Sequence, residues 1–566
     1  MFRKILIANR GEIAVRVIRT AREMGIESVA VYSDADREAL HVRLADEAHP
    51  IGAAAPTQSY LDGEKLIAVA LASGAQAVHP GYGFLAENAD FARRVVDAGL
   101  VWIGPHADAI RAMGDKLRAR QAMRAANVPS VPGGLNAIAD VAAARAAAEL
   151  YGLPLALKAA AGGGGKGLKV AHRAEEIESA LETARREARA YFKDDTIYAE
   201  RYLENPKHVE LQVLADKHGN VVHVGERDCS LQRRHQKLWE ETPAKIPEAV
   251  RSAMREAGLR AAKAIGYDSA GTIECLVSGD EFYFLEMNTR IQVEHTVSEM
   301  VSGLDLVREQ IRIAAGEPLG FTQEDLALRG FSIEGRVNAE DPSADFRPCP
   351  GTITAYREPG GLGVRIDSAA YPGWTIPPDY DSLIAKLIVW APTRDQALAR
   401  LHRAIDEYVI EGVPTTLPLL RALCDHPAVI DASYGTATLE RFASTFKPAT
   451  QNGLRLPAAP HAAERRFAPR LGAMRKRASA SSGNEVRSPM HGLVVEISVS
   501  PGDQVAEGQV VAVVEAMKMM NEIRAQRAGL VNAVHATVGS TVESGSALVT
   551  FAASDGSSGG SEIANS

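Results

Sequence analysis

Glu515-Ala516-Met517-Lys518-Met519-Met520 places a single lysine between methionines at the midpoint of a repeated glycine pattern. Glycines before this stretch recur after it with a shift of 37 residues, in the pairs Gly492 and Gly529, Gly502 and Gly539, and Gly508 and Gly545. In both halves, short β-branched runs are separated by glycine-containing turn signals. The duplication predicts a small all-β module over residues 485–552, with Lys518 on the turn between its halves.

The residues around Lys518 resemble the attachment site of biotin carboxyl carrier domains, in which a biotin protein ligase modifies the lysine of Ala-Met-Lys-Met. By this resemblance Lys518 is the biotinyl-lysine. A lipoyl domain shares the barrel and the hairpin lysine but usually lacks both flanking methionines, so Met517 and Met519 favour biotin. An alternative is that the lysine is only a solvated surface charge and the methionines only fill the core, which would account for each residue taken singly. It does not explain the tetrapeptide at the centre of a duplication.

Composition sets limits on the whole chain. Its 566 residues are 46% hydrophobic and 24% charged, which allows several domains with buried cores. The formal net charge of -8 provides no basic face for nucleic-acid phosphates, so we expect no nucleic-acid partner. The four cysteines are far apart and form no C-x-x-C pair, which fits a reducing compartment. No apolar run approaches transmembrane length, and we expect a cytoplasmic protein without a membrane partner.

The residue composition and the spacing of apolar runs change several times along the chain. Residues 1–113 alternate short apolar runs with helix-like stretches, which predicts an α/β domain. A larger mixed region follows to residue 445. Residues 446–484 are rich in Pro, Ala, Ser and scattered arginines, which is typical of a linker. The Ser- and Gly-rich residues 553–566 are expected to be a disordered tail.

A glycine-rich segment, Ala159 to Gly167, joins two predicted strands. Its backbone N–H groups can lie against phosphates because no Cβ blocks the approach. A mobile surface loop explains the glycines equally well. The segment fails the Walker A pattern at Ala160 and Gly167, so a P-loop fold is excluded. Gly81-Tyr82-Gly83 matches a dinucleotide fingerprint only loosely, and we interpret it as a tight turn beside a site.

The segment Glu286-Met287-Asn288-Thr289-Arg290-Ile291-Gln292-Val293-Glu294 alternates polar and apolar residues, which predicts an extended strand with one polar face. On such a strand Arg290 would orient Glu294. A hairpin around Asp280 would set Glu274 opposite Glu286. Facing carboxylates are tolerable if they hold a hard cation such as Mg²⁺ with ATP phosphates. A solvated edge strand is the alternative, but it predicts mixed polar residues without this order.

Four blocks of sequence resemble biotin carboxylases of the ATP-grasp superfamily. They are Ala8 to Ala14, His79 to Gly83, Arg227 to Ser230 and the polar segment Glu286 to Glu294. The resemblance implies a fold of mixed α/β and α+β class, with an N-terminal α/β domain (1–113), an ATP-grasp domain (114–330) and a C-terminal domain (331–445). The biotinyl/lipoyl-like barrel (485–552) would follow.

The resemblance also implies roles. ATP would be bound by Lys116, Lys158, Gly164, Gly165, Glu200, Arg201, Tyr202, Leu203, His208 and His235. The ligands of Mg²⁺ or Mn²⁺ would be Glu274, Glu286 and Asn288. Bicarbonate would be bound by Lys237, Arg290, Gln292 and the backbone of Val293, with Glu294 as its general base and Arg336 beside the biotin ring. Bicarbonate is a poor electrophile, so its activation by ATP needs cations around gathered negative charge. His208 and His235 are also compatible with a structural role.

Only 48 residues follow Lys518, which leaves no room for a carboxyltransferase. We therefore expect a separate carboxyltransferase (β) subunit, with this chain as the α subunit of an acyl-CoA carboxylase and a homo-oligomer within a larger complex. The short layout resembles actinobacterial α chains, and residues 462–477 are expected to help dock the partner. Acetyl- or propionyl-CoA is the expected acceptor, with methylcrotonyl-CoA or a long-chain acyl-CoA as alternatives. A non-catalytic carrier or scaffold is a remote alternative. A lipoyl-bearing acyltransferase would need His-x-x-x-Asp-Gly, which is absent.

Overall fold

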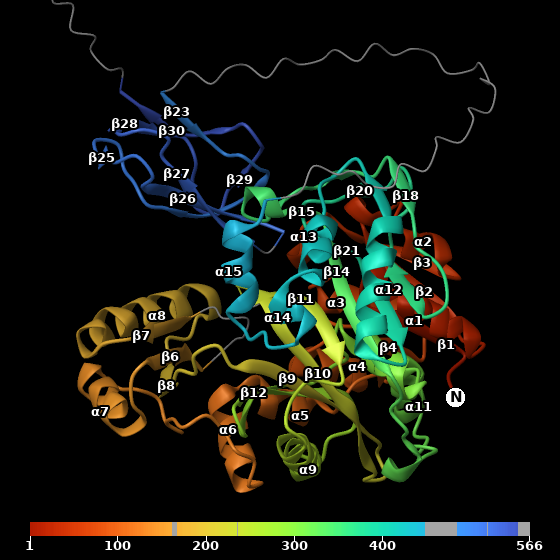
Figure 1. Ribbon diagram of the computed structural model, residues 1–566. Coiled ribbons are helices and arrows are strands. Elements are labelled where there is room, and N and C mark those ends of the chain that lie inside the picture. Colours follow the sequence, from red (N-terminus) through yellow and green to blue (C-terminus); the bar gives the residue numbers. More distant parts are fainter. Residues whose placement is uncertain (161–166, 235, 448–483, 518, 553–566) are drawn as a thin grey trace, which may run out of the picture. The chain divides into compact units, whose positions relative to one another are not determined.

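The structure is a computed structural model that describes residues 1–160, 167–234, 236–447, 484–517 and 519–552. They form two compact units, of which the larger holds most of residues 1–447 and the smaller carries strands β23 to β30 (Figure 1). No helix within these ranges is long and apolar enough to cross a bilayer. Most of the predicted linker and the predicted C-terminal tail lie outside the described residues.

The first sheet of the larger unit is parallel, with the strand order β3-β2-β1-β4-β5. Its central strand is fully buried from Ile5 to Ile7 and pairs with β2 on one side and β4 on the other. The elements are β1 (Lys4–Ile7), α1 (Gly11–Glu23), β2 (Glu27–Ser33), α2 (Leu40–Leu44), β3 (Glu47–Gly52), α3 (Gly63–Ala72), β4 (Ala77–His79), α4 (Ala89–Asp97), β5 (Val101–Trp102) and α5 (Ala107–Gly114). The α/β fold class predicted for this region is confirmed.

A three-stranded sheet, β7-β6-β8, follows in the chain. Its elements are α6 (Lys116–Ala125), α7 (Val141–Tyr151), β6 (Leu155–Ala159), β7 (Leu168–Ala171), α8 (Ile177–Phe192) and β8 (Ile197–Arg201). The small residues Ala144 and Ala184 let α7 and α8 pack closely on the strands around Leu157. The antiparallel strands β6 and β7 flank the glycine-rich segment, as predicted.

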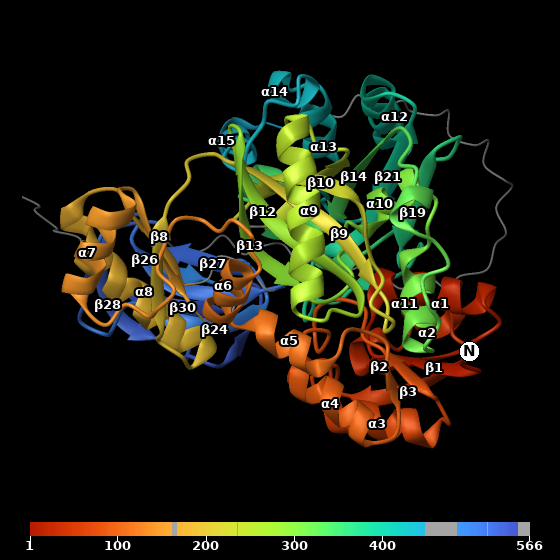
Figure 2. The same cartoon turned by 90° about the horizontal axis from the view of Figure 1, so that it is seen from below.

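An eight-stranded sheet forms the centre of the larger unit, in the order β13-β12-β9-β10-β11-β14-β21-β19. Helix α9 (Glu248–Ala264) covers one face of β9 and β10 (Figure 2). The contact is close because Gly258 has no side chain: a Cβ there would lie 2.3 Å from Leu211 Cδ2. The strands are β9 (Lys207–Ala215), β10 (Val221–Arg233), β11 (Gln236–Thr242), β12 (Ser269–Ser278), β13 (Glu281–Asn288), β14 (Phe331–Asn338), β19 (Val364–Ser368) and β21 (Leu383–Ala391).

The predicted strand over residues 286–294 is wrong in its second half. Strand β13 ends at Asn288, and α10 (His295–Ser302) begins after Glu294, its N-cap residue. The Arg290 side chain helps to turn the chain, since it donates back to the Asn288 side chain at 2.8 Å and to the Ile291 carbonyl at 3.3 Å. Such local side-chain bonds compete with the strand ladder. By contrast, the predicted pairing of Glu274 with Glu286 is confirmed.

The remaining elements complete the region up to residue 447. They are α11 (Leu306–Ala314), β15 (Glu340–Asp341), β16 (Arg347–Pro348), β17 (Gly351–Thr352), β18 (Ala355–Arg357), β20 (Thr375–Ile376), α12 (Arg394–Glu407), β22 (Val409–Glu411), α13 (Leu417–Cys424), α14 (Pro427–Ile430) and α15 (Thr438–Thr445). Helix α12 packs on β21 and β14 of the central sheet.

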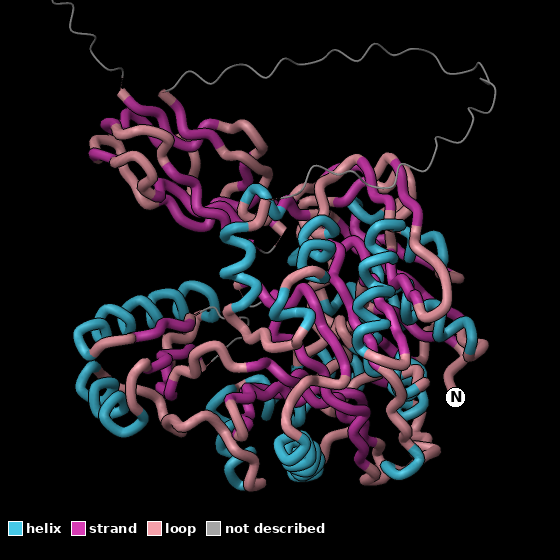
Figure 3. The backbone as a smooth tube through the Cα atoms, in the orientation of Figure 1, coloured by secondary structure: helices cyan, strands magenta, loops and turns pink. Residues whose placement is uncertain are grey.

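The described part of the smaller unit's C-terminal module consists of strands and loops (Figure 3). Two four-stranded sheets, β23-β30-β28-β25 and β27-β26-β24-β29, enclose a core rich in valine. The strands are β23 (Glu485–Arg487), β24 (Gly492–Ile497), β25 (Gln504–Val505), β26 (Val510–Ala516), β27 (Met519–Arg524), β28 (Gly529–Val534), β29 (Thr541–Val542) and β30 (Ala547–Phe551). The pairs β24 and β28, β25 and β29, and β26 and β30 begin 37 residues apart. The predicted duplication is therefore a structural one.

Strands β26 and β27 form a tight hairpin. Ala516 pairs with Met519, so only two residues connect the strands. Met517 has a φ of 50°, the left-handed conformation that two-residue hairpin turns require. Lys518 itself lies outside the described residues.

Candidate active site

Side chains from strands of the three-stranded and eight-stranded sheets, together with Glu87 and residues of α5, line a cavity of about 740 Å³ in the larger unit. Sixteen of the predicted site residues line it: Lys116, Lys158, Glu200, Arg201, Tyr202, Leu203, His208, Lys237, Glu274, Glu286, Asn288, Arg290, Gln292, Val293, Glu294 and Arg336. Gly164, Gly165, His235 and Lys518 lie outside the described residues. The fold therefore brings predicted site residues that are more than 200 positions apart in the sequence, such as Lys116 and Arg336, into one cavity.

Strand β9 shows how the fold builds this site. Its alternation sends Val209, Leu211 and Val213 into the hydrophobic core beneath α9. The intervening His208, Glu210 and Gln212 point to the opposite face, where they are 6%, 0% and 0% exposed. Burial of polar groups is costly unless they are paired, so this face must carry a connected polar network. Sequence reasoning missed Glu210, although the same alternation would have revealed it.

Lys237 on β11 is the centre of the network. Its ammonium lies 2.6 Å from Glu210, 2.9 Å from Glu274 and 2.6 Å from Glu294. Burial alone would lower the pKa of Lys237, but the three carboxylates outweigh burial and hold its pKa well above the usual value. Lys237 therefore remains a buried cation, placed where an anionic substrate would find positive charge.

Glu294 is held by two cations. One carboxylate oxygen accepts from Lys237 and the other from Arg336 on β14, at 3.0 Å. Burial would raise the pKa of Glu294, yet Lys237 and Arg336 bring its pKa well below the usual range. Arg336 also donates to Glu240, at 2.6 Å. Glu294 is thus oriented by Lys237 and Arg336, not by Arg290 as an extended strand would predict.

Arg290 has a different acidic partner. Its Nε donates to Glu87 at 2.8 Å, and the other Glu87 oxygen accepts the backbone N–H of Thr289 at 3.2 Å. Glu87 precedes α4 and lines the same cavity. It follows the Gly81-Tyr82-Gly83 turn, which sequence analysis placed beside a site without assigning Glu87 a role. The Glu87 carboxylate therefore occupies a guanidinium N–H of Arg290 that could also donate to a bound anion.

The acidic pair on β12 and β13 offers oxygen ligands for a metal ion. Glu274 and Glu286 are cross-strand partners, and the Asn288 amide donates to Glu274 at 2.9 Å. Among the described ion pairs, Glu286 has one partner, Lys116, at 3.4 Å. Carboxylates and an amide oxygen form the donor set that Mg²⁺ prefers, so these residues fit a metal bound together with phosphates. The Asn288 amide can turn to present its oxygen.

Two other groups of acidic, histidine and cysteine side chains are close enough to share an ion. Both contain Glu210, and they add His208 and Glu274 in one case and Cys229 and Glu294 in the other. The Lys237 ammonium already lies within hydrogen-bond distance of all three glutamates. A protein cation therefore provides the charge there that a metal ion would supply.

The same cavity is also lined by residues predicted to bind the nucleotide. Lys158 on β6 pairs with Glu200 on β8, and Arg120 of α6 holds the second oxygen of Glu200 at 2.7 Å. Glu200 begins the segment to Leu203 that lines the cavity. Lys116 and Lys158 supply positive charge to the cavity, as phosphate binding requires.

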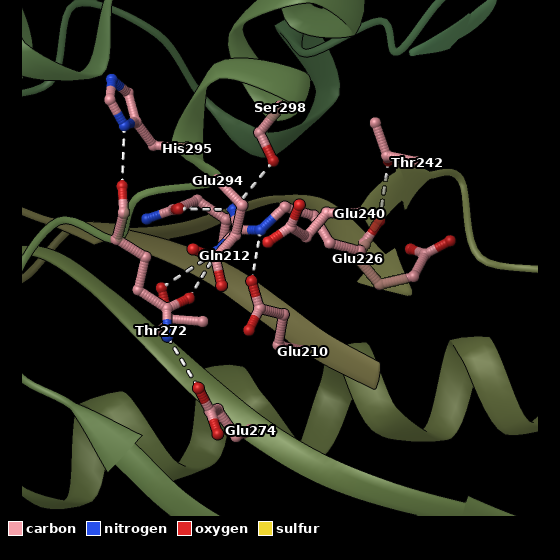
Figure 4. A network of polar contacts seen from close by, with 12 residues as sticks. Glu210, Gln212, Glu226, Glu240, Thr242, Thr272, Glu274, Glu294, His295 and Ser298 are labelled. Atoms are coloured by element: carbon pink, nitrogen blue, oxygen red, sulfur yellow. Dashed lines mark hydrogen bonds and ion pairs between the residues drawn. The ribbon is translucent and has the colours of Figure 1, made fainter. Parts of the chain in front are cut away.

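Arg227 on β10 is fully buried and does not line the cavity, but it donates to Gln292, which does. It donates to side chains from β9, β12, the segment before α10 and α10 itself (Figure 4). One acceptor is Gln292, predicted to bind bicarbonate, and another is Glu210, the partner of Lys237. Sequence analysis used Arg227 only to identify the family, since no sequence pattern shows which side chains a buried arginine reaches.

Comparisons with known proteins agree with this geometry. Family models match in succession along the chain: "Biotin carboxylase, N-terminal domain" over residues 1–110, "Carbamoyl-phosphate synthase L chain, ATP binding domain" over 115–322 and "Biotin carboxylase C-terminal domain" over 334–441. Biotin carboxylase 1 of Bacillus subtilis is 52% identical over 78% of this chain and 99% of its own length. The chain belongs to the biotin carboxylase family. It is an ATP-dependent enzyme of the ATP-grasp fold.

The biotin carboxylase region continues into a second matched module. The "Biotin-requiring enzyme" model matches residues 484–551, which contain Lys518. A biotin-dependent acyl-coenzyme A carboxylase alpha3 subunit of Mycobacterium leprae is 44% identical over 96% of this chain and 98% of its own. This biotin carboxylase therefore carries a biotinyl domain on the same chain.

Solved structures show the same fold for the larger unit. The biotin carboxylase domain of a 2-oxoglutarate carboxylase from Hydrogenobacter thermophilus has a TM-score of 0.77 and 49% identity, covering 79% of this chain and 99% of that one. It was solved as a dimer with MgADP, ADP and bicarbonate. A Campylobacter jejuni biotin carboxylase has a TM-score of 0.76 and 47% identity over 78% of this chain and 99% of that one.

Proposed function

We propose that this enzyme uses ATP and bicarbonate to carboxylate biotin carried on its own Lys518. The observation that carries the proposal is that one cavity is lined both by Lys116 and Lys158 and by Lys237, Arg290 and Glu294. Phosphoryl transfer from ATP to bicarbonate requires both substrates in one enclosed site, with cations around the gathered negative charge.

Two groups of cavity residues have distinct tasks in this proposal. Lys116, Lys158, His208 and the segment Glu200 to Leu203 hold ATP. Gly164, Gly165 and His235, which lie outside the described residues, are assigned to the same group. Glu274, Glu286 and Asn288 hold Mg²⁺, and the bound ion would neutralise charge on the phosphate oxygens. Mn²⁺ has the same preference for oxygen ligands and is a candidate substitute.

The residues assigned to bicarbonate combine anion binding with proton transfer. Lys237, Arg290, Gln292 and the Val293 backbone bind the anion. Against the effect of burial, Lys237 and Arg336 lower the pKa of Glu294 and keep this carboxylate ionised. Bicarbonate that draws Lys237 away would raise this pKa again, so that Glu294 can accept the proton of the substrate. Arg336 lies 3.0 Å from Glu294 and stabilises negative charge that develops beside it. Biotin would supply the ureido nitrogen that receives the carboxyl group.

The biotinyl domain offers one attachment point. Lys518 is the single lysine between residues 484 and 552, so a biotin protein ligase has no alternative lysine in this module. We assign residues 485–552 to the carrier, after an N-terminal domain (1–113), an ATP-grasp domain (114–330), a C-terminal domain (331–445) and a linker (446–484).

We further assign this chain to the α subunit of an acyl-CoA carboxylase, with the carboxyltransferase on a separate subunit. Similarity to the Mycobacterium leprae alpha3 subunit along almost the whole of both chains supports this assignment. Acetyl- or propionyl-CoA is the proposed acceptor. The complex, purified with its β subunit, should be assayed with acetyl-, propionyl-, methylcrotonyl- and long-chain acyl-CoA. Carboxylation of methylcrotonyl-CoA or a long-chain acyl-CoA alone would replace the proposed acceptor.

A direct assay tests the enzymatic step itself. The full chain is incubated with ATP, Mg²⁺ and free biotin, and ADP release is followed with and without bicarbonate. The proposal predicts bicarbonate-dependent release. A non-catalytic carrier or scaffold would show none, and that result would end the proposal.

A further inference from the structure

Arg227 has a complete set of partners. A guanidinium carries five N–H donors in a fixed planar fork, and each one has an acceptor here. The acceptors are Glu210, Gln212 at 2.7 Å, Ser298 at 3.0 Å, Thr272 at 3.2 Å and Gln292 at 2.9 Å. Figure 4 labels four of these acceptors, Glu210, Gln212, Thr272 and Ser298, within one network of polar contacts.

The bond to Gln292 decides which way its amide faces. Its oxygen accepts from Arg227, and its nitrogen consequently donates to Glu274, at 2.7 Å, on the cavity side. A reversed amide would place N–H against the guanidinium and oxygen against a carboxylate. Both contacts would be repulsive, so Arg227 fixes the orientation in which Gln292 offers N–H donors to an anion.

The bond to Glu210 acts on Lys237. One Glu210 oxygen accepts from Arg227, and the other accepts from Lys237 at 2.6 Å. Glu210 is fully buried, and an uncompensated carboxylate there would bind Lys237 more tightly. By sharing Glu210, Arg227 leaves the Lys237 ammonium freer to contact a substrate.

We propose that Arg227 is the positioning residue of the bicarbonate site: it presents the Gln292 amide N–H and the Lys237 ammonium to the anion without touching it. Arg227 does not line the cavity, whereas Gln292 and Lys237 do. This inference rests on the proposed function, because it assumes that these two side chains bind bicarbonate.

The test is Arg227→Lys in the full chain, with initial rates of ATP hydrolysis measured against bicarbonate and against ATP. Lysine keeps the charge beside Glu210 but cannot form the five-donor fork. The KM for bicarbonate should rise about tenfold, as expected for loss of a hydrogen bond to a charged group. The KM for ATP should change by less than about twofold, because Arg227 donates to no described residue that is assigned to ATP. Equal KM values for bicarbonate in the variant and the wild type would overturn the inference.

A double-mutant cycle with Gln292→Ala separates positioning from a general structural effect. If Arg227 acts through Gln292, adding Arg227→Lys to Gln292→Ala should raise the KM for bicarbonate by less than it does alone. Additive effects would contradict a role through Gln292. Arg16→Lys is the matched control, since Arg16 is a buried arginine paired with Glu299 and Asp305 away from the cavity. It should leave the KM for bicarbonate unchanged.

A second variant covers the case in which Arg227→Lys does not fold. Thr272→Val with Ser298→Ala removes two neutral acceptors of Arg227 and keeps its pairing with Glu210. The KM for bicarbonate should rise about threefold, because the Arg227 guanidinium is held less firmly without these two hydrogen bonds. An unchanged value would overturn the inference. If the wild type itself shows no bicarbonate-dependent hydrolysis, the proposed function fails instead.

Discussion

The Lys237 ammonium lies 2.6 Å from a carboxylate oxygen of Glu294, and both side chains are almost excluded from solvent. Two further carboxylates, Glu210 and Glu274, share the same ammonium. The proposed general base is therefore held in place by the cation that is proposed to bind the substrate. Bicarbonate that enters the site must compete with Glu294 for Lys237. Substrate binding would therefore weaken the ion pair that holds the proposed base.

Replacement of Lys237 by glutamine should abolish bicarbonate-dependent hydrolysis, with a fall of roughly 100-fold or more, because a charge aimed at the substrate is lost. It should also destabilise the fold by about 3–5 kcal/mol, since three buried carboxylates lose their shared cation. Hydrolysis rates and the thermal midpoint measure the two effects. Lys207→Gln is the matched control. Lys207 pairs with buried Asp228 at 2.8 Å outside the cavity, so this variant should lose stability but keep bicarbonate dependence.

Glu286→Gln should weaken the metal site selectively. The substitution removes one of two facing carboxylates, so the Mg²⁺ concentration for half-maximal hydrolysis should rise roughly tenfold. The KM for bicarbonate should stay near the wild-type value. Glu281→Gln, at the exposed start of the same strand, serves as the control. An unchanged Mg²⁺ requirement in Glu286→Gln would remove Glu286 from the metal site.

Glu240 gives the stability a defined pH dependence. Burial raises the pKa of Glu240 to about 7, against about 4.3 for an unfolded glutamate. Between these values the folded protein holds a proton that the unfolded chain has released, so stability falls as pH rises from about 4 to about 7. Glu240→Gln removes this term, and its thermal midpoint relative to the wild type should increase across that range. A midpoint difference that stays constant from pH 5 to 8 would contradict this environment for Glu240.

Lys518→Arg should separate the two activities of the chain. Arginine keeps the positive charge but cannot be acylated, since it stays protonated at neutral pH. Streptavidin binding and the mass increase from biotin should both disappear. Bicarbonate-dependent hydrolysis with free biotin should persist at the wild-type rate. Continued streptavidin binding by the variant would show that another residue carries biotin.

Local patterns predicted much of this site from the sequence. The hairpin around Asp280 set Glu274 opposite Glu286, because strand pairing follows from turn position and alternation. The 37-residue glycine repeat likewise predicted the two similar halves of the smaller module. The family resemblance added residues as distant as Lys116 and Arg336, which line one cavity.

What sequence analysis missed depends on contacts between distant segments. Perfect alternation could not show that β13 ends at Asn288, since the turn depends on Arg290 bonding to its own neighbours and to Glu87, 203 residues earlier in the chain. Arg227 was invisible as a positioning residue for the same reason, because its five acceptors come from four separate segments.

The most direct test of the account follows the carboxyl group itself. Biotinylated full-length protein is incubated with ATP, Mg²⁺ and radiolabelled bicarbonate, and label bound to the protein is counted after gel filtration. The account predicts ATP-dependent label that is absent in Lys518→Arg and in Lys237→Gln. Label that forms without ATP, or that persists in Lys518→Arg, would contradict it.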